Sequence, residues 1–325
     1  MSIRSPKQVL DAVVEAGRWA PSVHNTQPWA FAVAGEEISL RADAERKLSV
    51  GDAAGRELLI SCGAALFTMR TVMRCEGYEP VVRILPDPDR PGLLATVKPG
   101  GQVKADEPTW VLGGEIERRR THRAGFADVP VPEQLIESLV KAAMSEGAKL
   151  TPVRSPDAVS VLAALTQAAQ GVQGVQDQRF NLEVIRWARP PGSTRTDGVP
   201  AEGYPREAAP TEPHFPQRHY SWRHGWGSAG DQSEMVTGVV AVLTTPGDSR
   251  DEWIAAGQAL QHALLYASAH GVSAAFHTQA LENDLLREFL RLELCAGEYP
   301  QMIMRLGVTF DAKEVPRRPV SDVVE

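Results

Sequence analysis

The sequence predicts an α+β fold built from long helices and a few short strands that can pair antiparallel. Two observations lead to this prediction. Apolar residues recur at helical spacing over several long segments, and short apolar runs bounded by glycine, proline and polar residues lie between them. The composition agrees, because 325 residues with 43% hydrophobic and 23% charged content are typical of a globular chain of one large or two modest domains.

Local signals place the elements in order. The first helix begins with Pro6, a residue favoured in a first turn, and carries Val9, Val13 and Trp19 at helical spacing. Two long helices end at Gly77 and Gly271, because glycine readily adopts the left-handed cap conformation. Helices are predicted at 6–19, 54–77, 132–146, 156–170 with a continuation toward 187, 251–270 and 282–292. Strands are predicted at 29–34, 37–41, 80–86, 91–98, 108–112, 148–153, 235–245 and 299–310.

Charge and cysteine usage exclude several classes of protein. The net charge of −7 argues against nucleic-acid binding as the main function, because such domains are usually basic. The three scattered cysteines form neither a metal-spaced pair nor a disulfide framework. No run reaches the ~18 apolar residues of a membrane span, and no signal peptide is evident. We therefore expect a cytoplasmic protein with neither a nucleic-acid nor a membrane partner.

The segment 20–29, APSVHNTQPW, is the most informative part of the chain. Two prolines stiffen it, so that Ser22, Asn25 and Gln27 present donors and acceptors from a held backbone. Such an arrangement suits a flat ring rich in heteroatoms. The alternative is an ordinary turn after a helix, because proline, serine and asparagine are common turn residues.

The pattern Pro-Ser-x-x-Asn-x-Gln-Pro-Trp at 21–29 resembles the flavin-contacting loop of the nitroreductase family, whose members bind FMN. The segment 119–126, RRTHRAGF, is similar to the arginine segment that the family uses for the FMN phosphate and ribityl chain. In this chain the loop precedes the arginine segment, an order that resembles the mycobacterial Acg-type branch. The resemblance implies a central mixed sheet wrapped by helices, with flavin bound at a dimer interface.

The chain also contains a weak internal repeat. Residues 6–16 align with 132–142 at an offset of 126, and the helix from 57 aligns with the helix from 251 at an offset of 194. We therefore predict two fused nitroreductase-like halves, 1–112 and 113–325, with an insertion in the second half. The first half keeps the loop and the second keeps the arginine segment. One chain should thus act as a monomeric pseudo-dimer that holds one FMN.

The insertion shows in the composition of residues 189–230, which are rich in proline, histidine and aromatic residues. A long loop inside a compact domain is usually a functional lid or a linker, and linkers are poor in aromatic residues. We hypothesise a lid over a planar ligand. The alternative is a loop that covers the domain's own apolar surface.

The resemblance implies further contacts from the closing basic tract, at Arg317 and Arg318, and from the segment 277–279, which falls where the family presents groups to the flavin ring edge. Without the resemblance, the run at 118–120 is better explained as a solvated basic segment, or as a helix end that interacts with acids such as Glu115 and Glu117. The implied cofactor-binding residues are Pro21, Ser22, Asn25, Gln27, Arg119, Arg120, Thr121, Arg123, Thr278, Gln279, Arg317 and Arg318. No catalytic side chain or metal ligand is expected, since flavin carries the chemistry itself.

Three functions are consistent with these features. The first is an NAD(P)H-dependent oxidoreductase that reduces nitro or quinone compounds by a ping-pong flavin mechanism. The second is a flavin-binding protein that stores FMN or senses redox state, with the lid blocking turnover. The third, a degenerate flavin fold that mediates protein interactions, is disfavoured because both half-sites look intact.

Overall fold

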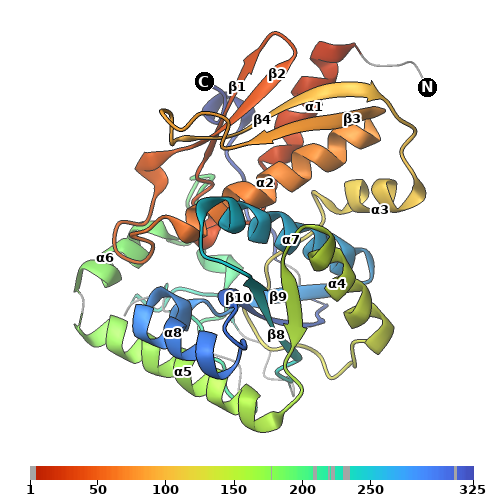
Figure 1. Cartoon of the computed structure of the whole chain (residues 1–325). Helices are drawn as coiled ribbons and strands as arrows, with labels where there is room; N and C mark the ends of the chain where they lie inside the picture. Colours follow the sequence, from red (N-terminus) through yellow and green to blue (C-terminus); the bar gives the residue numbers. More distant parts are fainter. Residues whose placement is uncertain are drawn as a thin grey trace.

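The computed structural model describes residues 5–176, 178–207, 211–218, 220, 224–229, 235–310 and 313–325. The predicted α+β class is confirmed: two antiparallel sheets are separated by helices, and further helices cover the lower sheet (Figure 1). His219 and Trp222, two of the insertion's aromatic side chains, lie outside the described residues.

The first sheet and its helices come from the first third of the chain. Ser5 caps helix α1 (Pro6–Gly17), and the chain continues through β1 (Trp29–Ala34), β2 (Glu37–Ala42), helix α2 (Arg56–Cys75), β3 (Tyr78–Ile84) and β4 (Leu93–Gln102). The strand order is β1-β2-β4-β3, with Phe31 opposite Leu40. The chain's end lies against the edge strand, where Phe31 donates its amide to the carbonyl of Val323 at 2.7 Å.

The second sheet comes from the later part of the chain. Its elements are helix α4 (Glu133–Ser145), β5 (Lys149–Pro152), β8 (Val239–Thr245), helix α7 (Arg250–Ala269), β9 (Val272–Phe276) and β10 (Tyr299–Val308). Helix α3 (Glu107–Glu115) precedes them, and helix α8 (Asp284–Glu293) lies between β9 and β10. The strand order is β5-β8-β10-β9.

The two sheets have the same topology. The first reads helix, strand, strand, helix, strand, strand in the order β1-β2-β4-β3, and the second repeats this series as β5-β8-β10-β9. The difference is an insertion between β5 and β8. It contains helices α5 (Pro156–Gln176) and α6 (Gln178–Trp187) and the two-residue strands β6 (Ala188–Arg189) and β7 (Val199–Pro200). This shared order supports the internal repeat inferred from the sequence.

Helices α2 and α7 cross at a pair of glycines. A Cβ on Gly63 would lie 2.2 Å from the carbonyl oxygen of Ile254, and a Cβ on Gly257 would lie 2.0 Å from that of Ile60. The two contacts are reciprocal, because Gly63 and Gly257, like Ile60 and Ile254, are 194 residues apart. Such reciprocity characterises two-fold interfaces, so the two halves meet as two subunits of a symmetric dimer would.

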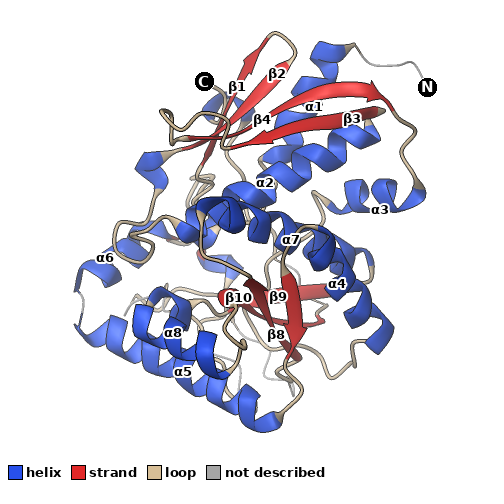
Figure 2. Ribbon diagram, in the orientation of Figure 1, coloured by secondary structure: helices blue, strands red, loops and turns tan. Residues whose placement is uncertain are grey.

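Apolar side chains divide the interior into layers. One core lies between the first sheet and helices α1 and α2, a second between the second sheet and helices α4 and α7, and a third where α5 and α8 cover the outer face of the second sheet (Figure 2). Among the described helices, α2 alone is long and apolar enough to cross a membrane. Its most apolar window is 78% buried in the protein, as expected for a core helix.

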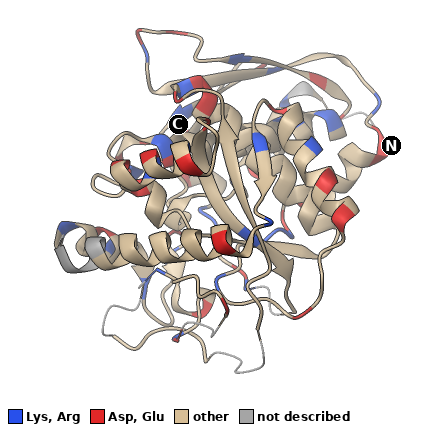
Figure 3. Cartoon of the chain, turned by 60° about the horizontal axis from the view of Figure 1, so that its bottom comes forward, with Lys and Arg blue, Asp and Glu red and all other residues tan. Residues whose placement is uncertain are grey.

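Figure 3 shows Lys and Arg interspersed with Asp and Glu over the face drawn. The sequence of helix α5 differs from this mixture of charges, because Asp157 is its one charged residue.

Three element predictions differ from the structure. The strand predicted at 108–112 is wrong: the segment is helix α3, whose first turn is capped by Asp106 accepting from the amide of Thr109 at 3.0 Å. A five-residue apolar run cannot by itself distinguish strand from helix. Strand β9 was missed, because its sequence VSAAF is rich in alanine, a poor strand former. The segment from 156 to 187 forms two helices.

The predicted boundary between residues 112 and 113 falls inside helix α3. A boundary placed before or after this helix would keep all of its residues in one half.

Candidate functional site

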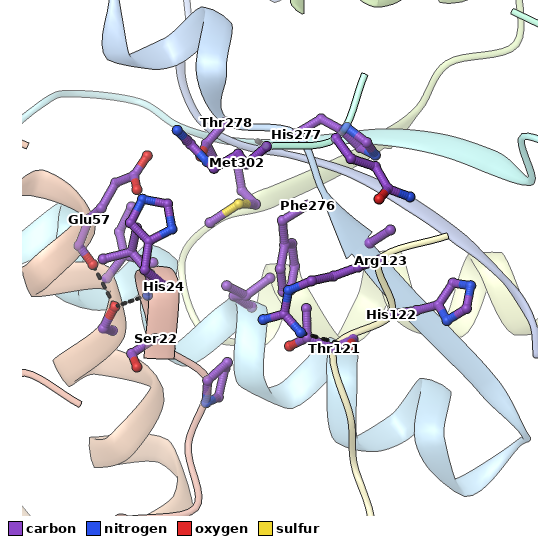
Figure 4. Close-up of a pocket in the computed structure, with 18 of the residues that line it drawn as sticks. Ser22, His24, Glu57, Thr121, His122, Arg123, Phe276, His277, Thr278 and Met302 are labelled. Atoms are coloured by element: carbon purple, nitrogen blue, oxygen red, sulfur yellow. Dashed lines mark hydrogen bonds between the residues drawn. The ribbon is translucent and has the colours of Figure 1, made fainter. Parts of the chain in front are cut away.

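A pocket lies where the two halves meet, walled by the start of α2, by α7, by the ends of β9 and β10 and by the insertion. Figure 4 shows Ser22, His24 and Glu57 on one side of this pocket and the segment 121–123 on the other, with Arg123 reaching into the space between them. The lining residues are Pro21, Ser22, Val23, His24, Glu57, Ile60, Ser61, Ala64, Thr121, His122, Arg123, Tyr204, Gln217, Arg218, Tyr220, Leu260, Ala275, Phe276, His277, Thr278, Met302 and Arg305.

The loop at 21–29 reaches the pocket through a strained turn. His24, Asn25 and Gln27 have φ values of 47°, 54° and 51°, in the left-handed region that side chains other than glycine seldom adopt. Ser22 holds the turn by accepting from the amide of Gln27 at 3.0 Å. The amide of Val23 donates to Ser61 Oγ of α2 at 3.3 Å, so the loop is anchored to the helix behind it (Figure 4).

The two carboxamides of this loop bind backbone atoms of other segments. Asn25 Nδ2 donates to the carbonyls of Gly198 at 2.9 Å and Pro316 at 3.1 Å, and Gln27 Nε2 donates to the carbonyl of Thr196 at 2.8 Å. Both residues are buried, and neither is on the pocket wall. Their observed role is to join the loop to the insertion and to the C-terminal tract.

Replacing Asn25 should therefore affect stability. Asn25→Ala leaves two carbonyls without their donor and should lower the unfolding free energy by about 2–3 kcal/mol. Asn25→Gly loses the same bonds but relieves the left-handed backbone, so it should be about 1 kcal/mol more stable than the alanine variant. Urea unfolding of both variants measures the two effects, and equal stabilities would show that the turn stores no strain.

The arginine segment runs beside β9. Thr121 forms a parallel bridge with Ala274, and the amide of His122 donates to the carbonyl of Ala274 at 2.8 Å. This pairing puts Thr121 and Arg123 on the pocket wall. Arg120 points instead to Glu314 of the C-terminal tract, 3.0 Å away.

Arg119 is the residue whose surroundings best fit an anionic ligand. Its side chain is 3% exposed, and within the described part of the chain none of its three guanidinium nitrogens has a hydrogen-bond partner. Burial, with Arg120 and Arg123 nearby, lowers its pKa from 12.5 to about 10. A buried cation without a counter-charge is costly, so this position fits an anionic group with several acceptor oxygens.

The C-terminal tract brings two more arginines to the loop. Arg317 donates to Asn25 Oδ1 at 3.0 Å, and the amide of Arg318 donates to Gln27 Oε1 at 2.7 Å. Burial lowers the pKa of Arg317 well below its usual value, and Arg119, Arg120 and Arg123 lower it further. Arg317 thus joins Arg119, Arg120 and Arg123 in one cationic cluster. The Arg318 guanidinium points elsewhere: it donates to the carbonyls of Gln27 and Asp322 and lies 3.9 Å from Asp43.

The segment after β9 is divided between the pocket and the core. Thr278 lines the pocket, whereas Gln279 is buried against Gln170 and the carbonyl of Pro216. His277 also lines the pocket, but both its ring nitrogens are engaged. Arg305 Nε donates to Nε2 at 2.8 Å, and Nδ1 lies 3.3 Å from the carbonyl of Pro216. A neutral ring protonated at Nδ1 satisfies both contacts, in agreement with a pKa that burial and Arg305 hold well below 6.5.

The insertion supplies one wall of the pocket through Tyr204, Gln217, Arg218 and Tyr220. The hydroxyl of Tyr220 lies 2.9 Å from His24 Nδ1. On the other side, Arg218 pairs with Glu282 and donates to Thr278 Oγ1 at 3.1 Å. The insertion is therefore attached to both halves across the pocket.

Sequence reasoning missed Glu57, Arg218 and Arg305 as pocket residues. For Arg305 a signal was available, because it is a single charged residue in the otherwise apolar strand β10 and is 2% exposed. Glu57 lies in the first turn of a core helix, where an acidic residue is also explained by the helix dipole. Among the described residues, no group of three histidine, cysteine or carboxylate side chains could hold a metal ion.

The two-fold arrangement of the halves, the loop and the arginine segment define an α+β protein with a pocket between its repeats. The sequence model of the nitroreductase family matches residues 4–59 and 116–308, and the chain belongs to this family.

The chain is 33% identical over 313 residues to a Mycobacterium tuberculosis protein whose name places it among the NAD(P)H nitroreductases, covering 94% of this chain and 88% of the relative. It is 26% identical to the NAD(P)H nitroreductase-named protein acg of the same organism, covering 97% and 95% of the two chains. Among solved structures, a nitroreductase with bound FMN from Bacteroides fragilis is 13% identical with a TM-score of 0.37, covering 66% of this chain and 95% of that chain. A BluB-like flavoprotein from Clostridium difficile is 14% identical with a TM-score of 0.40, covering 65% and 96%.

Proposed function

We propose that the chain binds one FMN between its two halves and is an oxidoreductase of the nitroreductase type. The observation that carries this proposal is Arg119, a buried guanidinium without a partner among the described residues. Arg119 does not itself line the pocket, but it precedes by two residues Thr121, which lines this pocket together with residues of both halves. Family membership and the names of the relatives support it.

In this proposal Arg119, Arg120 and Arg317 would hold the FMN phosphate, Arg318 would support the loop behind them through Gln27, and the pocket lined by Ser22 and Thr278 would hold the ring. Arginine suits this role, because its planar fork of donors matches phosphate oxygens. Arg123, whose side chain reaches into the pocket, is placed to interact with the developing charge of a reduced ring.

When bound, the flavin supplies the hydride chemistry. The chain's part is to hold the cofactor, to leave one ring face accessible and to exclude water from it. We propose NADH or NADPH as the reductant and nitro or quinone compounds as acceptors, which alternate in one subsite.

A second function is favoured by the contacts of the insertion. In this proposal the contacts of Tyr220 with His24 and of Arg218 with Glu282 hold the insertion as a lid across the pocket, and the Arg218 side chain is 11% exposed in the contact. If this lid stays closed, the protein stores FMN or senses its redox state instead of turning over.

An anaerobic titration separates the two functions. NADPH, and then NADH, is added to the purified protein while its visible spectrum is recorded. Rapid bleaching of a bound-flavin spectrum is expected for a reductase. A spectrum that bleaches with dithionite but not with either nucleotide would contradict turnover and support storage, and a chain that takes up no FMN would contradict both functions.

A further inference from the structure

Glu57 is the single carboxyl group among the residues that line the pocket. It lies in the first turn of α2 and is 4% exposed. Its Oε1 accepts from Arg56 Nη2 at 3.2 Å. The other ionisable groups of the pocket are arginines, histidines and tyrosines, so Glu57 differs from them in its chemistry.

A second carboxyl group, that of Asp52, binds the backbone at Glu57. Asp52 is 5% exposed, and its two carboxyl oxygens accept from the amides of Glu57 at 3.1 Å and Leu58 at 2.8 Å. Burial, followed by the negative charge of Glu57, raises the pKa of Asp52 from 3.8 to about 6. Two buried carboxyl groups that disfavour each other's charge tend to share a proton.

Charged groups from α2 itself and from other elements face this pair. Arg56 donates to the carbonyl of Gln301 in β10 at 2.7 Å. Burial and the charge of Arg287 in α8 lower the pKa of Arg56, and the charge of Asp248 before α7 raises it. Burial lowers the pKa of Arg218, which belongs to the insertion, and the charge of Glu57 raises it.

Two of the three histidines of the pocket are poor sources of an acidic proton, and the third, His122, has its Nε2 2.7 Å from the carbonyl of Gly125. Burial, with Arg218 and Arg123, keeps the pKa of His24 well below 6.5, so its ring is neutral near pH 7. His277 is neutral as well, and its ring nitrogens are already engaged by Arg305 and Pro216.

Reduction of either proposed acceptor requires one acidic proton beside the hydride. A quinone takes up a hydride and a proton to give a hydroquinone, and a nitro compound takes up the same pair to give a nitroso compound and water. We propose that Glu57 is the proton donor to the acceptor in this pocket and that Asp52 is a positioning residue that keeps Glu57 supplied with its proton. This inference rests on the proposed oxidoreductase function.

In this step the O–H bond of the Glu57 carboxyl breaks and an O–H bond forms on the acceptor oxygen. The two electrons arrive with the hydride from the reduced flavin, whose source is the nicotinamide nucleotide. Glu57 then regains a proton from Asp52, and the pair is recharged from solvent.

The test compares Glu57→Gln with Asp251→Asn. Glutamine keeps the shape of the side chain and removes the proton. Asp251 is the matched control, because it lies 194 residues after Glu57 in the first turn of α7, is exposed and is not on the pocket wall. Each FMN-loaded protein is reduced anaerobically with dithionite and mixed with 1,4-benzoquinone from about pH 5 to about pH 8.

We expect the wild type and Asp251→Asn to reoxidise at a rate that falls as the pH rises through the titration of the pair. Glu57→Gln should be slower by about 10²–10⁴-fold and should lose this pH dependence. Asp52→Asn, which can still cap the helix, should change the pH profile, because it removes the carboxyl group proposed to supply Glu57 with its proton. Reoxidation of Glu57→Gln at the wild-type rate, or with an unchanged pH profile, would overturn the proposal.

A second readout is independent of turnover. In the flavin-free chain, the infrared carbonyl band of a protonated carboxyl group should disappear near pH 6, and it should weaken in Glu57→Gln and Asp52→Asn but not in Asp251→Asn. A band that is the same in all four proteins would overturn the shared proton. Failure to take up FMN would contradict the oxidoreductase function, whereas a loaded Glu57→Gln protein with normal kinetics would contradict the role of Glu57 alone.

Discussion

Replacing Arg119 with methionine is expected to weaken FMN binding by about 3 kcal/mol or more, a loss of at least about 100-fold in affinity. The estimate follows from two charge-assisted hydrogen bonds to a phosphate, each of which contributes about 1.5–3 kcal/mol. Arg119 has three buried nitrogens without partners among the described residues, so it can make such a paired contact without breaking an existing one.

The same substitution should stabilise the flavin-free chain. Burial lowers the pKa of Arg119 from 12.5 to about 10, so keeping this side chain charged in the folded state costs about 3 kcal/mol at neutral pH. Methionine has a similar length and carries no charge, and it removes this cost. Urea unfolding without FMN should therefore show a more stable variant, and the gain should vanish when FMN is present.

Arg118→Met is the matched control, because the Arg118 side chain is 77% exposed and pairs only with Glu115 at 3.4 Å among the described residues. It should change neither FMN affinity nor stability by more than about 0.5 kcal/mol. If Arg119→Met bound FMN as tightly as Arg118→Met, the phosphate assignment would be wrong.

Gly257→Ala is expected to destabilise the chain by about 3 kcal/mol or more. The new Cβ would lie 2.0 Å from the carbonyl oxygen of Ile60 and 2.9 Å from the amide nitrogen of Ala64, which are backbone atoms of the facing helix. The two helices would have to move apart, and overpacking of this kind costs more than the gain that alanine brings to a helix. Because the pocket takes its walls from both helices, FMN uptake should fall as well.

Gly171→Ala is the comparison for this variant. Gly171 lies inside α5, and a Cβ there meets nothing within 4 Å. Alanine should therefore stabilise the chain by about 0.5–1 kcal/mol. Denaturant unfolding of both variants measures the difference. Equal stabilities would show that α2 and α7 do not meet as closely as their glycines indicate.

Much of this fold could be predicted from the sequence, because the strongest signals are local. The helical spacing of Val9, Val13 and Trp19 and the terminal glycines at 77 and 271 define helices whose existence needs no tertiary information. The repeat offsets also anticipated that the second half would follow the order of the first. Predictions from short apolar runs were wrong, because packing against other elements decides whether the segments of α3 and β9 form a helix or a strand.

The site could be predicted only in outline. Linear patterns identified the loop and the arginine segment, but not the direction in which each side chain points. Asn25 and Gln27 bind backbone carbonyls of distant segments, because the left-handed turn aims them away from the pocket. Glu57 and Arg218 reach the pocket through the packing of α2 and of the insertion, which no local pattern encodes.

The central claim is that one chain forms one complete flavin site between its two halves. It is tested most directly by counting FMN released on denaturation per chain, in a sample whose native mass is measured by light scattering. The account predicts one FMN per chain in a particle with the 35.3 kDa mass of a monomer. Two FMN per chain, or one FMN shared by two chains, would contradict it.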